Sequence, residues 1–334
     1  MSTMLQPRFL RRMLTNSPPP PSRVLPVGIS KYVHSPQLDK DGWSAVTTNP
    51  NDSSDNTHAP AALRLVTWNV DFMAPNAGAR VSCILDHLQK VVLAGSDSSC
   101  ILLQELKRDS FDEMLRSKWV REHYAVTPPS TESWGGERRY GIATLVSRNI
   151  RATNAQMAQF THSTMGRTAL FVDVEMSLPG DSGDSKDSDS ESKELETRVV
   201  RIANTHLESL SEGEQERPLQ LQIIADALRE EGVTGGGLVG GDMNMIMPAD
   251  QDIHVRAALQ DACDDPSAVT WGFQPRKRYP ARRLDRVFYV GDQLEVAPVE
   301  VIGKGLKVEG RGPRAQWASD HCGLMTTIRL RSES

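Results

Sequence analysis

The feature that most constrains this chain is a recurring pattern: a short apolar run ends in acid, amide or histidine side chains. The clearest case is the run Leu238-Val239-Gly240-Gly241, which is followed at once by Asp242 and then by Asn244. On an extended chain, residues two apart point the same way, so both polar side chains can face one centre. The glycines permit close backbone approach, or a φ angle that other residues avoid. Alone, such a segment is also typical of an ordinary turn.

The same pattern occurs at five other places along the chain. Taken singly, each has an ordinary interpretation as a turn cap, a surface ion pair or a hydrogen-bonded histidine. Ligand sites in sheet proteins gather at strand ends, so the ordered set predicts that these side chains meet at one rim. The other members are Trp68-Asn69, Gln104-Glu105, Asn204-Thr205-His206-Leu207-Glu208-Ser209, Leu284-Asp285-Arg286 and Ser319-Asp320-His321.

Short apolar runs alternate with amphipathic segments, but several predicted strands follow one another without a helix. This order favours a mixed sheet, or two sheets with helices outside, over a purely parallel sheet. In the longest later helix we expect Leu219, Ile223 and Ala227 to face inward. The predicted strands are 63–69, 100–103, 123–127, 141–147, 168–176, 198–206, 237–241, 284–290 and 323–330, and the predicted helices are 79–94, about 111–115, 214–231 and 252–262.

The 334 residues suffice for one large domain with tails, which we expect at 61–331. Residues 1–60 are predicted to be a disordered, proline-rich tail, because they lack a sustained apolar period. The first 38 residues carry five Lys or Arg and no acid, which suits a mitochondrial presequence or, in better agreement with the early prolines, a basic tail. The segment 179–197, with seven acids and two lysines, is predicted to be a disordered surface insert.

The overall charge of −5 conceals a basic stretch at 274–286, which holds six basic residues and one acid. Trp271 stands just before it, and an aromatic beside basic residues suits single-stranded nucleic acid. The alternative is a solvated basic loop with Trp271 packed on the core. None of the four cysteines lies in a Cys-x-x-Cys pair, which argues against a cysteine zinc site and suits a reducing, intracellular compartment. No apolar run is long enough for a membrane span.

The ordered motifs resemble those of the endonuclease/exonuclease/phosphatase superfamily, the DNase I-like proteins, over roughly residues 61–330. The resemblance implies an α/β fold, a four-layer α/β sandwich of two packed mixed β-sheets flanked by helices, with Mg²⁺ or Mn²⁺ at the site. The sequences HLES, TW and LDRVF are most similar to the 5′-tyrosyl-DNA phosphodiesterase branch. Two features depart from that branch: Ile246 stands where an arginine is usual, and no N-terminal ubiquitin-binding segment is evident.

The resemblance also implies roles for individual residues. Asp242 orients and deprotonates a water, Asn244 holds the nucleophile or a phosphate oxygen, and His321 stabilises negative charge on the phosphorus oxygens. Asp285 fixes the tautomer of His321, and His206 contacts the phosphate from the other side. Carboxylate and amide oxygens are what a hard divalent cation prefers. The predicted metal ligands are Glu105, Asn69 and Asp320, and the predicted substrate contacts are Ser209, Tyr140, Arg167, Trp271 and Arg283.

We therefore expect a metal-dependent phosphodiesterase that hydrolyses phosphoesters at single-stranded DNA ends. One alternative is a phosphatase or phospholipase of the same superfamily that acts on inositol phosphates or sphingolipids. Others are an inactive binding module that keeps the fold, and a scaffold that uses the tail and insert. The sequence suits the nucleus or cytoplasm, with the mitochondrion as the alternative compartment.

Overall fold

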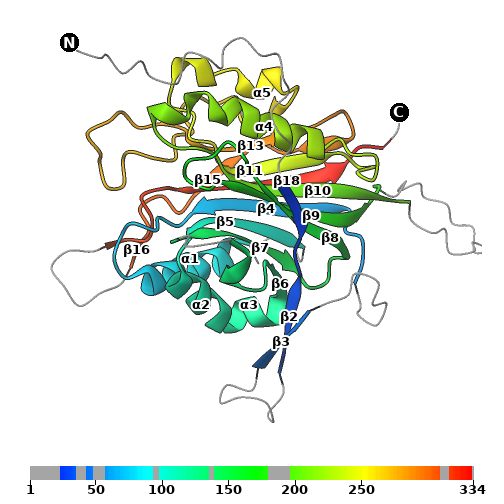
Figure 1. Ribbon diagram of the computed structural model, residues 1–334. Helices are drawn as coiled ribbons and strands as arrows, with labels where there is room; N and C mark the ends of the chain where they lie inside the picture. Colours follow the sequence, from blue (N-terminus) through cyan, green and yellow to red (C-terminus); the bar gives the residue numbers. More distant parts are fainter. Residues whose placement is uncertain are drawn as a thin grey trace, which may run out of the picture.

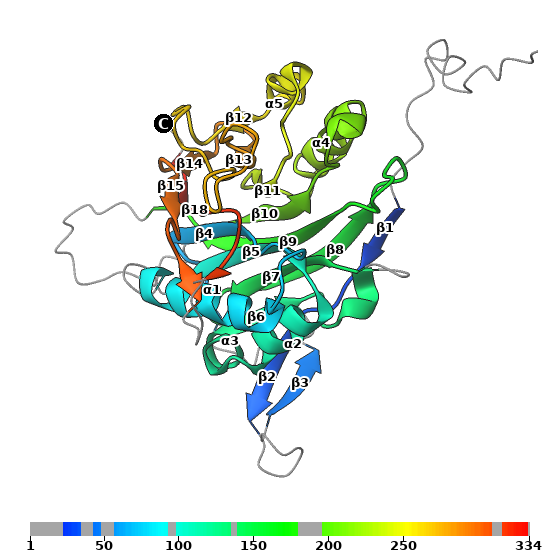
Figure 2. The ribbon, with the colours of Figure 1, turned by 90° about the vertical axis from the view of Figure 1, so that its left-hand side faces the viewer.

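The computed structural model describes residues 23–34, 43–47, 57–92, 98–134, 139–179, 196–308 and 316–332. Two β-sheets pack face to face, and helices cover the outer face of each, so the molecule has four layers (Figure 1). Figure 2 shows the same layers from the side, with α4 and α5 over one sheet and α1 to α3 over the other. The predicted α/β sandwich of two mixed sheets flanked by helices is confirmed.

One sheet, here sheet A, has seven strands in the order β1-β8-β9-β10-β11-β13-β12. Among the described strands of this sheet, β10 and β11 run parallel and the other neighbouring pairs run antiparallel. The strands are β1 (Arg23–Pro26), β8 (Ala152–Gln159), β9 (Thr168–Ser177), β10 (Thr197–His206), β11 (Gly237–Asp242), β12 (Gln260–Asp261) and β13 (Asp285–Tyr289).

The other sheet, sheet B, has nine strands in the order β14-β18-β4-β5-β7-β6-β2-β3, with β15 also paired to β18. Here β4 and β5 are the parallel pair. A separate hairpin joins β16 (Lys307–Val308) to β17 (Gln316–Trp317). The strands of sheet B are β2 (Ser30–His34), β3 (Trp43–Thr47), β4 (Ala62–Asn69), β5 (Ser99–Leu106), β6 (Tyr124–Thr127), β7 (Gly141–Ser147), β14 (Leu294–Val296), β15 (Glu300–Ile302) and β18 (Gly323–Leu330).

The α-helices divide between the two outer faces (Figure 1). No helix in the described ranges combines the length and apolarity needed to cross a membrane. The α-helices are α1 (Ala77–Val92), α2 (Arg108–Arg116), α3 (Lys118–His123), α4 (Glu216–Ala227) and α5 (Ile253–Arg256), and the short 3-10 helices are η2 (Thr131–Trp134), η3 (Ser211–Glu214) and η4 (Pro248–Asp250).

Three apolar layers fill the spaces between the four structural layers. One lies between sheet B and its helices, around Trp68 and Ile84. The middle layer joins the two sheets through residues such as Leu102 and Ile202, and the third lies between sheet A and α4. Because the central strands are covered on both faces, they read as continuous apolar runs in the sequence. Because both faces of these central strands are buried, the strands are held in place, and so are the polar residues at their ends.

Strand register brings the polar strand ends together. The parallel pair β10–β11 sets His206 beside Asp242, and the parallel pair β4–β5 sets Asn69 beside Gln104. The antiparallel pair β11–β13 then sets Asp242 beside Asp285. Parallel strands end at the same edge of a sheet, so these side chains share one rim of the sandwich.

The prediction that residues 1–60 are unstructured is wrong for the described parts of this segment. β1 adds an edge strand to sheet A by pairing with β8, and the β2–β3 hairpin extends sheet B from β6. Backbone hydrogen bonds to existing sheet edges stabilise these strands, which an apolar periodicity test cannot detect. Residues 1–22 of the predicted basic start and nearly all of the acidic insert, 180–195, lie outside the described residues.

Other differences concern elements with weak apolar patterns. The strand β8 was not predicted, because its sequence ATNAQMAQ is mostly small and polar. The helix predicted at 252–262 is only the short α5, and β12 follows it. In α4 the buried face includes Leu221, Ile224 and Arg217, whereas the predicted inward residue Leu219 is exposed. Because Arg217 is part of the buried face, the positions of the apolar residues alone do not identify that face of α4.

Candidate active site

Asp242 lies at the end of β11 in the centre of the rim, and its side chain is buried. Its Oδ2 accepts a 3.0 Å hydrogen bond from Asn69 Nδ2, and its Oδ1 accepts one of 3.0 Å from the backbone N–H of Asn244. Burial raises the pKa of Asp242 to about 6, while His321 opposes this shift. A carboxylate with a pKa near the working pH is suited to accept a proton from a nucleophile.

Asn244 has a left-handed backbone, with φ of 48°. Its Nδ2 donates to the carbonyl of Leu207 at 3.1 Å, on the loop that follows β10. The prediction that Asp242 and Asn244 face one centre through an extended i, i+2 geometry is therefore wrong in its detail. The chain turns after Asp242, and a hydrogen bond from the backbone N–H of Asn244 to the Asp242 side chain replaces strand alternation.

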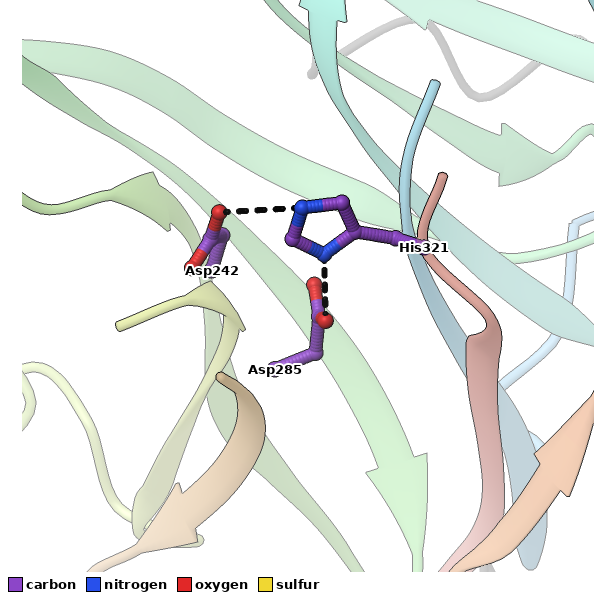
Figure 3. A group of neighbouring side chains, drawn as sticks. All are labelled: Asp242, Asp285 and His321. Atoms are coloured by element: carbon purple, nitrogen blue, oxygen red, sulfur yellow. Dashed lines mark hydrogen bonds and ion pairs between the residues drawn. The ribbon is translucent and has the colours of Figure 1, made fainter. Parts of the chain in front are cut away.

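His321 lies between two carboxylates (Figure 3). Its Nδ1 is 2.7 Å from Asp285 Oδ2, and its Nε2 is 3.8 Å from Asp242 Oδ2. Burial lowers the pKa of His321, but Asp285, Asp242 and Asp320 outweigh burial and raise it well above the ordinary value. The ring is therefore a buried imidazolium at neutral pH, whose Nδ1 proton is held by Asp285. This dyad matches the predicted relation between the two residues.

His206, at the end of β10, has the opposite electrostatic character. Burial, and then the charges of Arg167 and His321, lower its pKa well below the ordinary value. Its Nδ1 is 2.9 Å from the guanidinium of Arg167. A guanidinium can only donate, so Nδ1 accepts and the neutral ring carries its proton on Nε2. That Nε2 has no hydrogen-bond partner and lies 3.5 Å from Asp242 Oδ2 and 3.8 Å from Glu105 Oε1.

Glu105 lies in β5 at an irregularity in the pairing with β7, and its φ is 61°. This positive φ turns the side chain toward the rim, and its Oε2 accepts a 2.8 Å hydrogen bond from the N–H of Phe72. Burial raises the pKa of Glu105 to about 7. No lysine or arginine of the described residues forms an ion pair with this carboxylate. The Glu105 side chain is 14% exposed, and the groups that favour its charged form are the N–H of Phe72, the side chain of Asn69 and the more distant His321.

Asp320 lies at the same rim but is held by other partners. Its Oδ2 accepts a hydrogen bond of 3.1 Å from Trp271 Nε1 and pairs with Lys277 Nζ at 3.1 Å. Burial opposes ionisation of Asp320, but His321 and Lys277 outweigh it and lower its pKa. Among the contacts of the described residues, none joins Asp320 to the other two predicted metal ligands.

Three predicted substrate contacts form one group beside His206. The guanidinium of Arg167 donates to Tyr140 Oη at 3.0 Å and to Ser209 Oγ at 2.6 Å. Tyr140 stacks on Phe72, with ring centroids 4.0 Å apart. Arg167 is 5% exposed, and its Nε has no hydrogen-bond partner. In the described part of the chain Arg167 forms no ion pair, so this group presents a buried positive charge.

Of the other two predicted substrate contacts, Trp271 contacts Asp320, and Arg283 lies apart from the group around Arg167. Its guanidinium contacts Asp261 and, at 2.5 Å, the carbonyl of Cys263. Asp261 also pairs with Arg286 at 2.9 Å, so one carboxylate serves two arginines. These residues line a separate open cavity of about 610 Å³ together with Ile246.

Two sets of residues offer ligands for a divalent cation. Ligand atoms of Asp242, Asp285 and His321 lie within 4.8 Å of one another. In this set, however, His321 is protonated on Nδ1, and an imidazolium repels a cation. Among the described residues no lysine or arginine pairs with Glu105, and its carboxylate interacts with the side chain of Asn69, so these two residues fit a hard cation better.

Several supporting residues had no role assigned from the sequence. Glu208 accepts hydrogen bonds from Ser163 Oγ at 2.5 Å, Thr164 Oγ1 at 2.6 Å and Met165 N at 2.9 Å. It thereby anchors the loop that carries Arg167. The position of Glu208 in the HLES motif was visible, but its partners lie some forty residues away and carry no motif.

The paired glycines of the central motif are explained by sheet packing. Gly241 has φ of 155°, and a Cβ there would lie 1.9 Å from the carbonyl oxygen of Thr205. We expect Gly241→Ala to lower the free energy of unfolding by more than ~3 kcal/mol, because backbone must move to admit the methyl group. Gly232→Ala is the matched control, since nothing lies within 4 Å of its Cβ position. Urea denaturation checks this, and equal stability of the two variants would contradict it.

The model of the Endonuclease/Exonuclease/phosphatase family matches residues 66–321, which include every strand terminus described above. The chain belongs to this family. Its members are phosphoester hydrolases, and membership supports phosphoesterase activity. No curated protein sequence gave a significant match to the chain.

Solved structures with the same fold share few identical residues with the chain. Truncated TDP2 of Caenorhabditis elegans is 20% identical with a TM-score of 0.57, over 80% of this chain and 97% of that one. D. rerio TDP2 complexed with a single strand DNA product is 18% identical with a TM-score of 0.58, over 80% and 99%. The human Nocturnin catalytic domain with bound sulfate is 18% identical with a TM-score of 0.52, over 81% and 95%.

Proposed function

We propose that this protein is a divalent-metal-dependent phosphodiesterase that hydrolyses phosphoesters at the ends of single-stranded DNA. The observation that carries the proposal is the rim itself. It sets a carboxylate with a raised pKa, Asp242, between a neutral histidine and a protonated one. A base and fixed positive charge on the two sides of a reaction centre suit attack of water on a phosphoester.

Glu105 and Asn69 would hold the cation, which we propose to be Mg²⁺ or Mn²⁺. The fit rests on the Glu105 carboxylate, which pairs with no lysine or arginine of the described residues, and on Asn69 Oδ1, which also accepts from the N–H of Asp71 at 2.9 Å. When bound, the ion supplies positive charge to a phosphate oxygen and lowers the cost of charge development. Asp320, whose carboxylate contacts Lys277 and Trp271, is proposed as a more distant acidic neighbour of the ion.

The roles of the chain's own groups follow from their protonation. Asp242 orients the attacking water and accepts its proton, and the amide of Asn244 holds the nucleophile or a phosphate oxygen. The imidazolium of His321, fixed by Asp285, stabilises negative charge on the phosphoryl oxygens. His206 donates its unpaired Nε2–H from the other side.

The Arg167 group supports a substrate with an aromatic leaving group. A guanidinium with Tyr140 beside it, stacked in turn on Phe72, offers aromatic and cationic contacts to a phenol. A 5′-phosphotyrosyl DNA end presents a phosphate, a phenol and a single strand, and phenoxide leaves more readily than an alkoxide. The D. rerio TDP2 complex with a DNA product and the resemblance of the HLES and TW motifs support this substrate class.

A phosphatase or phospholipase acting on inositol phosphates or sphingolipids is the second candidate. It is favoured by Ile246, which stands where the tyrosyl-DNA branch has an arginine. The apolar residues near it, Met245 and Met247, line the 610 Å³ cavity beside the rim. An inactive binding module would not need the raised pKa of Glu105 or the His321–Asp285 dyad.

A panel of phosphoesters tests the proposal. We expect Mg²⁺-dependent turnover of a 5′-tyrosyl oligonucleotide, loss of turnover in EDTA, and recovery on adding Mg²⁺. Glu105→Gln should weaken Mg²⁺ binding measured by calorimetry and leave thermal unfolding near that of the wild type. Faster turnover of sphingomyelin or an inositol phosphate than of the oligonucleotide would transfer the proposal to the second candidate. Undiminished turnover in EDTA would remove the metal from it.

A further inference from the structure

Lysine ammonium groups lie over aromatic rings at three places within the segments 271–277, 304–307 and 317. Such pairs are worth about 0.5–1 kcal/mol at exposed sites, and each ring restricts the positions that the ammonium occupies. We call this set the lysine–aromatic row. Its members are Lys277 at 6.0 Å from the ring centroid of Trp271, Lys304 at 5.5 Å from that of Phe273, and Lys307 at 4.5 Å from that of Trp317.

The row is continuous with the candidate active site through one glutamine. Gln274 donates from Nε2 to the carbonyl of His321 at 3.3 Å, and its Oε1 accepts from the N–H of Gly305 at 2.9 Å. Phe273 precedes this glutamine, and Lys304 precedes Gly305. The second pair of the row therefore lies next to the segment that holds the buried imidazolium.

The third pair belongs to β16 and β17, and β16 follows Gly305 closely in the chain. The N–H of Ala318 donates to the carbonyl of Leu306 at 3.1 Å, and Lys307 then pairs directly with Trp317 across β16–β17. The hairpin lies beside α1 (Figure 1), and Arg80 of α1 donates from Nε to the carbonyl of Trp317 at 3.1 Å. The row is thus built on paired and anchored backbone.

The outer two lysines carry charge that the described residues do not neutralise. Lys277 pairs with Asp320, but the ion pairs of the described chain include neither Lys304 nor Lys307, and both are exposed. Exposed cations beside ring faces suit a flexible polyanion whose bases can stack, which is a single-stranded nucleic acid. A membrane surface would instead favour lysines around apolar side chains that insert into it.

We propose that Lys304–Phe273 and Lys307–Trp317 extend a binding path for single-stranded nucleic acid away from the candidate active site. The starting point of the path rests on the proposed function, whereas binding by the two outer pairs does not. Nucleotides next to the reacting end would contact Trp271, and those further along the strand would contact the outer pairs. Affinity for a strand should then depend on its length.

Fluorescence anisotropy with 3′-labelled dT4 and dT15, in EDTA to prevent hydrolysis, tests this path. We expect the double variant Lys304→Gln/Lys307→Gln to raise the Kd for dT15 about tenfold at 0.1 M salt. The slope of log K against log salt should fall by about 1.4, because each lost phosphate contact on a single strand contributes about 0.7. The Kd for dT4 should stay within about twofold of the wild-type value.

The control is Lys90→Gln/Lys118→Gln, which removes the same charge from exposed positions on α1 and α3. Equal weakening by both double variants, equal loss for dT4 and dT15, or unchanged dT15 binding would overturn the proposal. So would wild-type protein that binds phosphatidylserine vesicles through Lys304 and Lys307 but does not bind dT15. Length-dependent binding without hydrolysis of any panel substrate would support the row and defeat only the proposed function.

Discussion

Asp242→Asn is expected to lower kcat by about 10²–10⁴-fold on whichever phosphoester the protein turns over, with KM nearly unchanged. The substitution keeps the shape of the side chain, and the Oδ1 contact to the N–H of Asn244 can persist. What it removes is the proton acceptor whose pKa burial raises to about 6. An amide at this position cannot accept a proton from the attacking water, so the loss should appear in the chemical step.

Steady-state kinetics with saturating Mg²⁺ measures this effect, and thermal unfolding shows whether the fold is kept. Asp265→Asn is the matched control, since Asp265 is an exposed loop acid that accepts from Ser267. We expect the control to retain activity within about twofold, as surface substitutions usually do. An Asp242→Asn protein with wild-type kcat would exclude Asp242 as the base.

The layout of the site could be predicted from the sequence because its residues are tied to strand ends. Central strands buried on both faces produce apolar runs that are easy to recognise, and a polar residue that follows one must lie at the rim. The polar residues that follow such runs include Asn69, Glu105, His206, Asp242 and Asp285, and the register of β4–β5 and β10–β11–β13 brings these strand ends together.

The protonation states could not be predicted in the same way. His206 and His321 occupy similar places in the sequence pattern, yet their pKa values shift in opposite directions. The difference comes from their partners: Arg167 faces one ring and Asp285 the other. These contacts join residues tens of positions apart, so no local motif reports them.

Elements held by edge pairing or by buried charge were also beyond the sequence. β1 and β3 are short edge strands whose stability comes from the sheets that they join. The face of α4 was misassigned because Arg217, fully buried, forms a bidentate ion pair with Asp250 at 2.9 and 2.8 Å. The apolar periodicity of a helix treats arginine as a surface residue, so the side of α4 predicted to be buried differs from the side that is buried.

His321→Ala is the second change expected to have a large effect, and it separates electrostatic stabilisation from proton abstraction. Removing the ring deletes a buried positive charge and leaves Asp285 buried without the partner that now lies 2.7 Å away. We expect kcat to fall by about 10²–10³-fold, as for loss of a group that stabilises developing negative charge. The pKa of Asp242 should rise in this variant, because in the wild type His321 opposes the effect of burial on that carboxyl.

Exogenous imidazole should restore part of the activity of His321→Ala but none of that of Asp242→Asn. His254→Ala, which removes a histidine stacked on Phe288, is the control and should keep near wild-type turnover. If both histidine variants lose activity in proportion to a fall in thermal stability, His321 acts through packing and the electrostatic role is wrong.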